Sequence, residues 1–183
     1  MFWWCGLLVQ CTGTEKEKVT KYFDLEGFIE SQVQRLESDN PELIKTMKFK
    51  DDSESVTVYG ADSINWTKEL KLFLEHDINK PVLIDAYETK QDSSSTGEKV
   101  KSYHLIDNNQ NGILGMEIVF NSQDHVTSWR SSFQEENILY NNYREMTLTA
   151  DDNGKISGYT VSGYHRLIMN DTVHYYITAQ LSY

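Results

Sequence analysis

Residues 138–165 read ILYNNYREMTLTADDNGKISGYTVSGYH, and this stretch decides the fold. Residues 138–149 and 155–165 are rich in Tyr, Thr, Ile and Val, which favour β-strands. The polar sequence Asp151-Asp152-Asn153-Gly154 lies between them, and its Asn-Gly pair predicts a type I′ turn with positive φ at both central residues. The stretch therefore predicts a long antiparallel hairpin.

The same alternation of strand-like and turn-like segments extends from Pro81 to the C-terminus. Short polar connections rich in Asn, Asp, Ser and Gly separate the segments, and connections this short cannot form the crossovers that parallel strands need. We therefore expect an antiparallel meander here. The expected strands are residues 82–89, 100–106, 113–120, 126–133, 138–149, 155–165 and 173–181.

Upstream of Pro81 the apolar pattern becomes helical. Asp24 is a suitable N-cap for a first helix, which must end before Pro41 because proline cannot continue it. A second helix is expected over residues 64–76, with Asp62 or Ser63 as its N-cap. The apolar faces are Leu25, Phe28, Ile29, Val33 and Leu36 in the first helix, and Trp66, Leu70, Phe73 and Leu74 in the second.

A further hairpin is expected between the two helices, with strands at residues 43–49 and 55–59. A large bent sheet needs cover on one face, and the two helices are the available elements. We therefore expect one α+β domain over residues 22–183. Its core would be a curved antiparallel meander sheet, or half-barrel, of about seven to nine strands with two helices packed on one face.

Composition excludes several classes of protein. The chain has 28 Asp and Glu against 17 Lys and Arg, a net charge of -11, which opposes sequence-independent binding to nucleic acid or anionic lipid. Its two cysteines, Cys5 and Cys11, both lie near the N-terminus, which excludes a disulfide-stapled scaffold and a Cys-rich zinc module.

The N-terminal sequence is apolar and ends at a cysteine. Leu8-Val9-Gln10-Cys11 is followed by a charged stretch, residues 12–21. This arrangement resembles the lipobox of bacterial lipoprotein signals, although Gln10 stands where that pattern has a small residue. The resemblance implies lipidation at Cys11, a signal remnant at residues 1–11 and a flexible tether at residues 12–21. It also implies a bacterial envelope location, periplasmic or anchored to the outer membrane. The alternative is an apolar tail that docks on the domain through Trp3 and Trp4.

The usual signatures of catalysis are missing from the sequence. There is no Gly-x-Ser-x-Gly nucleophile elbow and no Gly-rich phosphate loop. The histidines have no ligand spacing, although His165 and His174 could face each other across the last hairpin. The run from Asp107 to Gly112 has an acidic start but lacks the ligand pattern of a calcium loop. We therefore expect no catalytic residue, no metal site and no cofactor.

Two sets of side chains within strands have both a structural and a functional interpretation. Glu117, Arg130 and Arg144 could form a charge row across three neighbouring strands, either as solvated ion pairs or as the lining of a cavity beneath the helices. The aromatic residues, which make up 12% of the chain, could bind sugars, peptides or lipids, or pack within the sheet.

Two resemblances bear on function. The lipobox-like start, the acidic body, the segments Tyr22-Phe23-Asp24-Leu25 and Asp77-Ile78-Asn79-Lys80-Pro81, and the many Asn/Asp turns resemble small envelope lipoproteins of Bacteroidota. The expected helix-covered half-barrel is similar in architecture to lipoprotein carriers of the LolA and LolB type.

These observations predict a non-catalytic envelope lipoprotein that binds a ligand or partner, either an unidentified protein or an apolar molecule. The alternatives are a half-barrel carrier of lipids or lipoproteins, and an enzyme. A large cavity between the helices and the sheet would favour the carrier. A polar cleft with convergent Asp, His and Arg would favour the enzyme. A filled core with an apolar surface patch would favour the binding module.

Overall fold

The computed structural model describes residues 20–49, 52–58, 64–95, 97–107, 111–169 and 171–183. Two α-helices, one 3-10 turn and nine strands make up this part of the chain. In chain order they are α1 (Leu25–Asp39), β1 (Glu42–Phe49), β2 (Asp52–Val58), α2 (Trp66–Leu74), η2 (Pro81–Leu83), β3 (Tyr87–Ser93), β4 (Lys99–Leu105), β5 (Gly112–Phe120), β6 (Val126–Glu136), β7 (Tyr140–Ala150), β8 (Ile156–Leu167) and β9 (Val173–Ser182).

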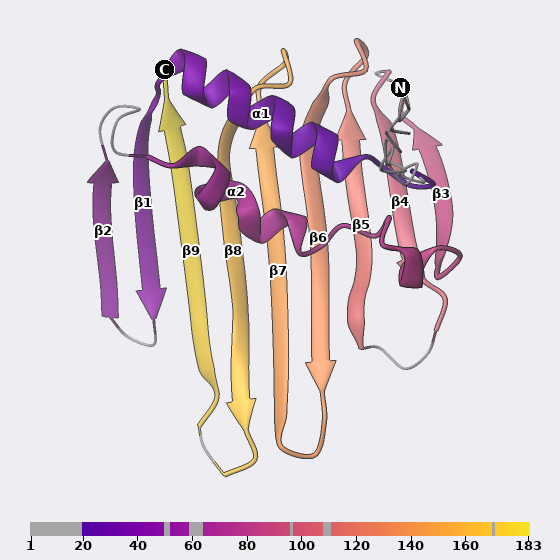
Figure 1. Ribbon diagram of the computed structural model, residues 1–183, viewed down its shortest axis with the longest axis vertical. Helices are drawn as coiled ribbons and strands as arrows, with labels where there is room; N and C mark the ends of the chain where they lie inside the picture. The colour runs from indigo at the N-terminus through magenta and orange to yellow at the C-terminus, as the bar shows by residue number, and fades with distance from the viewer. Residues whose placement is uncertain (1–19, 50–51, 59–63, 96, 108–110, 170) are drawn as a thin grey trace, which may run out of the picture.

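The nine strands form one open, curved antiparallel sheet in the order β2-β1-β9-β8-β7-β6-β5-β4-β3. The chain begins the meander at the far edge with β3 and returns strand by strand to β9, which pairs with β1. Figure 1 shows both helices in front of one face of this sheet, crossing the upper part of the strands. The expected α+β meander with two helices on one face is confirmed.

Helix α1 begins and ends where the sequence indicates. The Asp24 side chain accepts a hydrogen bond from Gly27 N at 3.1 Å and caps the first turn. The helix ends at Asn40, whose left-handed conformation (φ 50°) directs its N–H to Leu36 O, and Pro41 follows. The cap at Asp24 is therefore confirmed.

Helix α2 is shorter than expected and has another cap. It runs from Trp66 to Leu74, and the Asn65 side chain accepts from Lys68 N at 2.8 Å. Because Asn65 is the cap, the expected cap at Asp62 or Ser63 was wrong; those two residues lie outside the described part of the chain.

The space between α2 and the sheet is filled with side chains. Trp66, Leu70 and Phe73 are each 1% exposed, as expected, whereas Leu74 is only partly buried. The Phe73 ring makes edge contacts with Trp129 of β6 at 5.8 Å and Tyr159 of β8 at 5.4 Å between centroids. Packed aromatic rings therefore occupy the region where a cavity would have favoured a carrier.

Two local expectations need correction. In the turn before β8 only Gly154 has positive φ (72°), and Gly154 N donates to Asp151 O while Asp151 N donates to Lys155 O. This is a type I turn closed by a left-handed glycine, not a type I′ turn.

The strand expected over residues 82–89 is shorter in the structure. A 3-10 turn occupies Pro81–Leu83, and β3 begins only at Tyr87, because Asp85 has a left-handed backbone (φ 74°) that a strand does not accommodate.

Candidate functional site

The helices leave the lower part of their face of the sheet uncovered (Figure 1). Strand pairing aligns the side chains on this part in cross-strand rows, because residues opposite each other share a face. One row consists of Phe49, Tyr175, Gly163, Arg144 and Phe133. We call the uncovered part, from Met47 and Ile177 through this row to Tyr140 and Leu167, the open half-face.

The open half-face exposes large apolar side chains. Phe49 is 50% exposed, Met47 44% and Leu167 41%. Tyr175 and Ile177 are half-buried between them. A contiguous apolar patch on a protein surface marks a site of contact with a partner or ligand more often than scattered apolar residues do.

Gly163 shapes the centre of the open half-face. A Cβ on Gly163 would lie 2.8 Å from the ring carbon Cζ of Tyr175 and 2.1 Å from the backbone oxygen of Tyr143. A side chain at position 163 would overlap the Tyr175 ring, which lies against strand β8 at this position. The glycine therefore allows an aromatic ring to form part of the floor of the open half-face.

Arg144 marks the border between the covered and open parts. Its Nη1 lies 3.0 Å from Glu75 Oε2, and its side chain is 24% exposed. The expected row of Glu117, Arg130 and Arg144 is therefore wrong in its third member. Glu117 and Arg130 are directly opposite each other and exposed on the face away from the helices, whereas Arg144 points to the helices.

Glu117 and Arg130 lie in a shallow hollow of about 280 Å³. The residue of β7 opposite Arg130 is Thr147, and Glu145, opposite Ser132, lines the hollow together with Glu117, Arg130 and His104. Glu117 is exposed, so its carboxylate is hydrated. The geometry fits the solvated interpretation of these charges.

The two histidines that could have faced each other across the last hairpin lie on opposite faces of the sheet. His165 is opposite Val173 in the β8–β9 pairing and contacts the Tyr140 ring, whereas His174 is opposite Tyr164. The two histidines therefore do not form a cross-strand pair, because the register differs by one residue from the one such a pair needs. Within the described residues, no group of three or more His, Cys, Asp or Glu side chains is placed to hold a metal ion.

His76 is a residue whose role sequence reasoning missed. It is the last residue of the helix expected over residues 64–76, and it is only 2% exposed, against the rings of Trp129 and Phe133. Burial, together with the smaller effect of the positive charges of Arg144 and Lys80, lowers the pKa of His76 to about 3. Its position three residues after Phe73, on the same helical stripe, was the signal for burial.

A second polar group lies at the other border of the open half-face. The Tyr159 hydroxyl donates to Glu69 Oε1, and Lys45 Nζ lies 2.7 Å from the same oxygen. Burial raises the pKa of the Tyr159 phenol far above its ordinary value, and the hydrogen bond to Glu69 adds to this effect. The contacts fasten α2 to strands β1 and β8, which is a structural role.

Cys11, the expected lipidation site, lies outside the described residues. In the described parts of the chain, each helix is too short or too polar to cross a bilayer. Comparison with protein-family models, with curated proteins and with solved structures found no match.

Proposed function

We propose that this chain is a non-catalytic lipoprotein of the bacterial cell envelope, anchored through Cys11, that binds a partner at its open half-face. The observation that carries the proposal is the contrast between the two parts of one sheet face. Under α2 the face is closed by residues that are about 1% exposed, while beyond α2 Phe49 and Met47 remain about half exposed.

The packing favours a surface-binding module over a carrier. A carrier of lipids needs an enclosed apolar volume of its own, and the rings of Phe73, Trp129 and Tyr159 fill the space beneath α2. A filled core with an adjoining apolar patch is the arrangement expected of a protein that docks a partner. The half-barrel carrier remains the alternative, as an outcome of the binding experiment below.

The anchor is tested by covalent labelling. The full gene is expressed with radioactive palmitate, as wild type, as Cys11→Ala and as the matched control Cys5→Ala. We expect label in the wild type and in Cys5→Ala, and none in Cys11→Ala. Label that persists in Cys11→Ala would place the lipid elsewhere, and a wild type without label would remove the lipoprotein assignment.

Binding is tested by site-specific photocrosslinking in the source organism. A photoreactive phenylalanine analogue replaces Phe49 on the open half-face or, as a control, Ile44 on the opposite face of the same strand, which is 39% exposed. We expect a crosslinked product of higher mass only from position 49. Crosslinking at position 49 to lipid alone would favour the carrier, and no product from position 49 would contradict binding at this surface.

A further inference from the structure

The ends of two neighbouring hairpins carry a concentration of exposed apolar side chains. Among the described residues, five of the twelve exposed large hydrophobic residues lie there, at exposures from 41% to 93%. They are Ile138 and Leu139 in the β6–β7 connection and Leu167, Ile168 and Met169 at the β8–β9 connection. We call these five residues the hairpin-tip patch.

The two connections form one unit. Ile168 N donates a hydrogen bond to Leu139 O at 3.0 Å, which joins the two hairpins at their ends. Figure 1 shows both hairpins projecting below the lower ends of the neighbouring strands. The patch is therefore the narrow, protruding end of an elongated sheet and not a flat surface.

Polar backbone groups at the tip of the first hairpin have partners within the tip. The Asn137 side-chain oxygen accepts from Leu139 N at 2.8 Å and from Tyr140 N at 3.1 Å. Asn137 N donates to Tyr140 O at 2.9 Å. Backbone N–H groups without partners are costly in hydrocarbon, so a tip that satisfies these groups internally can enter an apolar medium without that cost.

The charges around the tip differ from those of the whole protein. Residues 137–143 and 164–169 contain no Asp, Glu or Lys and one Arg, in a chain whose net charge is -11, and Glu135, Glu136 and Asp171 flank these segments. The arginine, Arg166, is opposite Asn141, and both line a hollow of about 310 Å³ between the hairpins. The Asn141 side-chain oxygen is buried and has no hydrogen-bond partner among the described residues. The Arg166 guanidinium behind an apolar tip suits the phosphate of a zwitterionic lipid headgroup.

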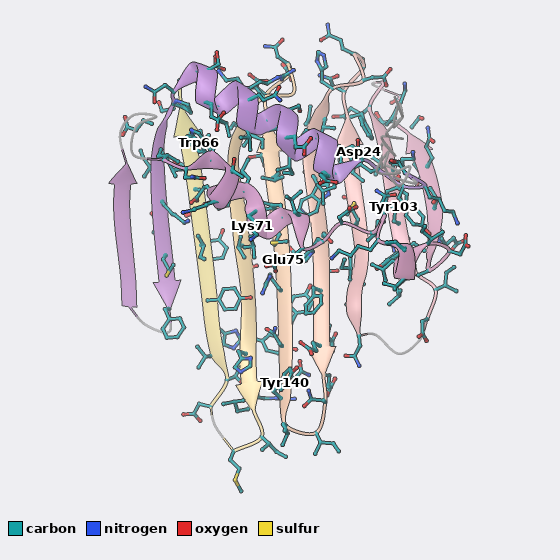
Figure 2. All side chains as sticks on the ribbon, viewed as in Figure 1. Asp24, Trp66, Lys71, Glu75, Tyr103 and Tyr140 are labelled. Carbon is teal, nitrogen blue, oxygen red and sulfur yellow. The ribbon has the colours of Figure 1, made fainter. Side chains whose placement is uncertain are left out.

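We propose that the hairpin-tip patch inserts into the surface of a zwitterionic lipid bilayer. A bilayer can surround a narrow convex end, whereas two convex ends placed tip to tip would bury little of the roughly 1,600 Å² typical of a stable protein interface. The contact is separate from an anchor at Cys11. Figure 2 places Asp24, at the start of the described domain, and Tyr140, beside the patch, toward opposite ends of the sheet.

The test measures the fluorescence of a probe placed in the hairpin-tip patch itself. In the full-length Cys5→Ala, Cys11→Ala background, a single Met169→Cys is labelled with the environment-sensitive fluorophore NBD. The matched control is Val82→Cys, because Val82 is 86% exposed at a distant turn. Phosphatidylcholine vesicles should shift the emission at position 169 to the blue, and lipids with a quencher on the acyl chain should quench it. Position 82 should not respond.

A second substitution measures how far the patch drives binding. Ile138→Asp should weaken the apparent vesicle affinity reported at position 169 at least tenfold, whereas Ile106→Asp, at a residue 62% exposed in another loop, should leave it within twofold. Replacing part of the phosphatidylcholine with phosphatidylglycerol should weaken binding at low salt, because the acidic protein is repelled.

Three results would overturn the proposal. They are no response at position 169 at saturating lipid, tighter binding to phosphatidylglycerol that salt abolishes, and a blue shift without vesicles that grows with protein concentration, which would assign the patch to a second copy of the chain. The background lacks Cys11, so a failure of the palmitate experiment leaves this test unaffected.

Discussion

The imidazole Nδ1 of His76 lies 3.0 Å from the Oγ of Ser131, a contact that joins the end of helix α2 to the middle of strand β6. Ser131 Oγ donates its own proton to Gly115 O at 2.8 Å. The serine oxygen therefore accepts from the histidine, which carries a proton on Nδ1, and the low pKa of His76 makes the ring neutral at pH 7. The chain of bonds links α2, β6 and β5 beneath the border of the open half-face.

This arrangement makes stability depend on pH. Burial holds the pKa of His76 at about 3 in the folded protein, against 6.5 in the unfolded chain, so the unfolded state binds more protons between these values. The stability due to a neutral His76 is complete above pH 6.5 and is lost as the pH falls toward 3. Between pH 7 and pH 4 the wild type should lose about 3 kcal/mol more unfolding free energy than His76→Gln.

Urea unfolding curves at several pH values measure this difference. His104→Gln is the control, because His104 is exposed on the sheet. The control should follow the wild-type pH dependence. If the unfolding free energies of the wild type and His76→Gln fall equally with pH, the burial of neutral His76 does not cause the loss of stability in acid.

Helix α2 should depend on Phe73 far more than on Leu74. Phe73 is 1% exposed between Trp129 and Tyr159, so Phe73→Ala should lower the unfolding free energy by roughly 3–5 kcal/mol. Leu74 is only partly buried, so Leu74→Ala should lower the unfolding free energy clearly less. Chemical denaturation of the two variants checks the order, and a Phe73→Ala curve within about 0.5 kcal/mol of wild type would refute the packing of α2 on the sheet.

One buried glutamine of helix α1 forms two hydrogen bonds with the turn before β8 and the start of that strand. Gln32 is 2% exposed, its Nε2 donates to Gly154 O at 2.9 Å, and its Oε1 accepts from Ile156 N at 3.1 Å. Gln32→Ala removes the acceptor of the buried Ile156 N–H and leaves Gly154 O with only the longer bond from Arg35 Nη1 at 3.4 Å, so it should cost about 1–3 kcal/mol. Gln34→Ala, at an exposed position of the same helix, should change stability by less than about 0.5 kcal/mol. Equal effects in thermal unfolding would contradict a role for the two hydrogen bonds.

The phenol of Tyr159 should contribute through its bond to a carboxylate. Tyr159→Phe keeps the buried ring but removes the donor to Glu69, so it should cost about 1.5–3 kcal/mol, the range for hydrogen bonds to charged groups. Tyr164→Phe is the matched control on the same strand, half-buried on the opposite face. Denaturant midpoints measure both, and a neutral Tyr159→Phe would show that Lys45 alone satisfies Glu69.

Features that depend on neighbouring residues were predictable from the sequence. The cap at Asp24 and the end of α1 before Pro41 follow from chemistry within one turn of helix. The meander follows from connections too short to cross over the sheet. The apolar stripe that buries Trp66, Leu70 and Phe73 follows from the 3.6-residue period. Each of these is set within a few residues along the chain, which is why pattern alone determined them.

The strand register, and the part of the sheet that the helices cover, could be determined only from the tertiary structure. A shift of one residue in strand pairing exchanges the two faces, so the sequence could not place Arg144 beside Glu75 or separate His165 from His174. The burial of His76 needed Ser131, which lies 55 residues away in the chain. The open half-face and the hairpin-tip patch exist because the helices are shorter than the sheet they cover and because two hairpins end side by side. Those are relations between elements, and no local pattern encodes them.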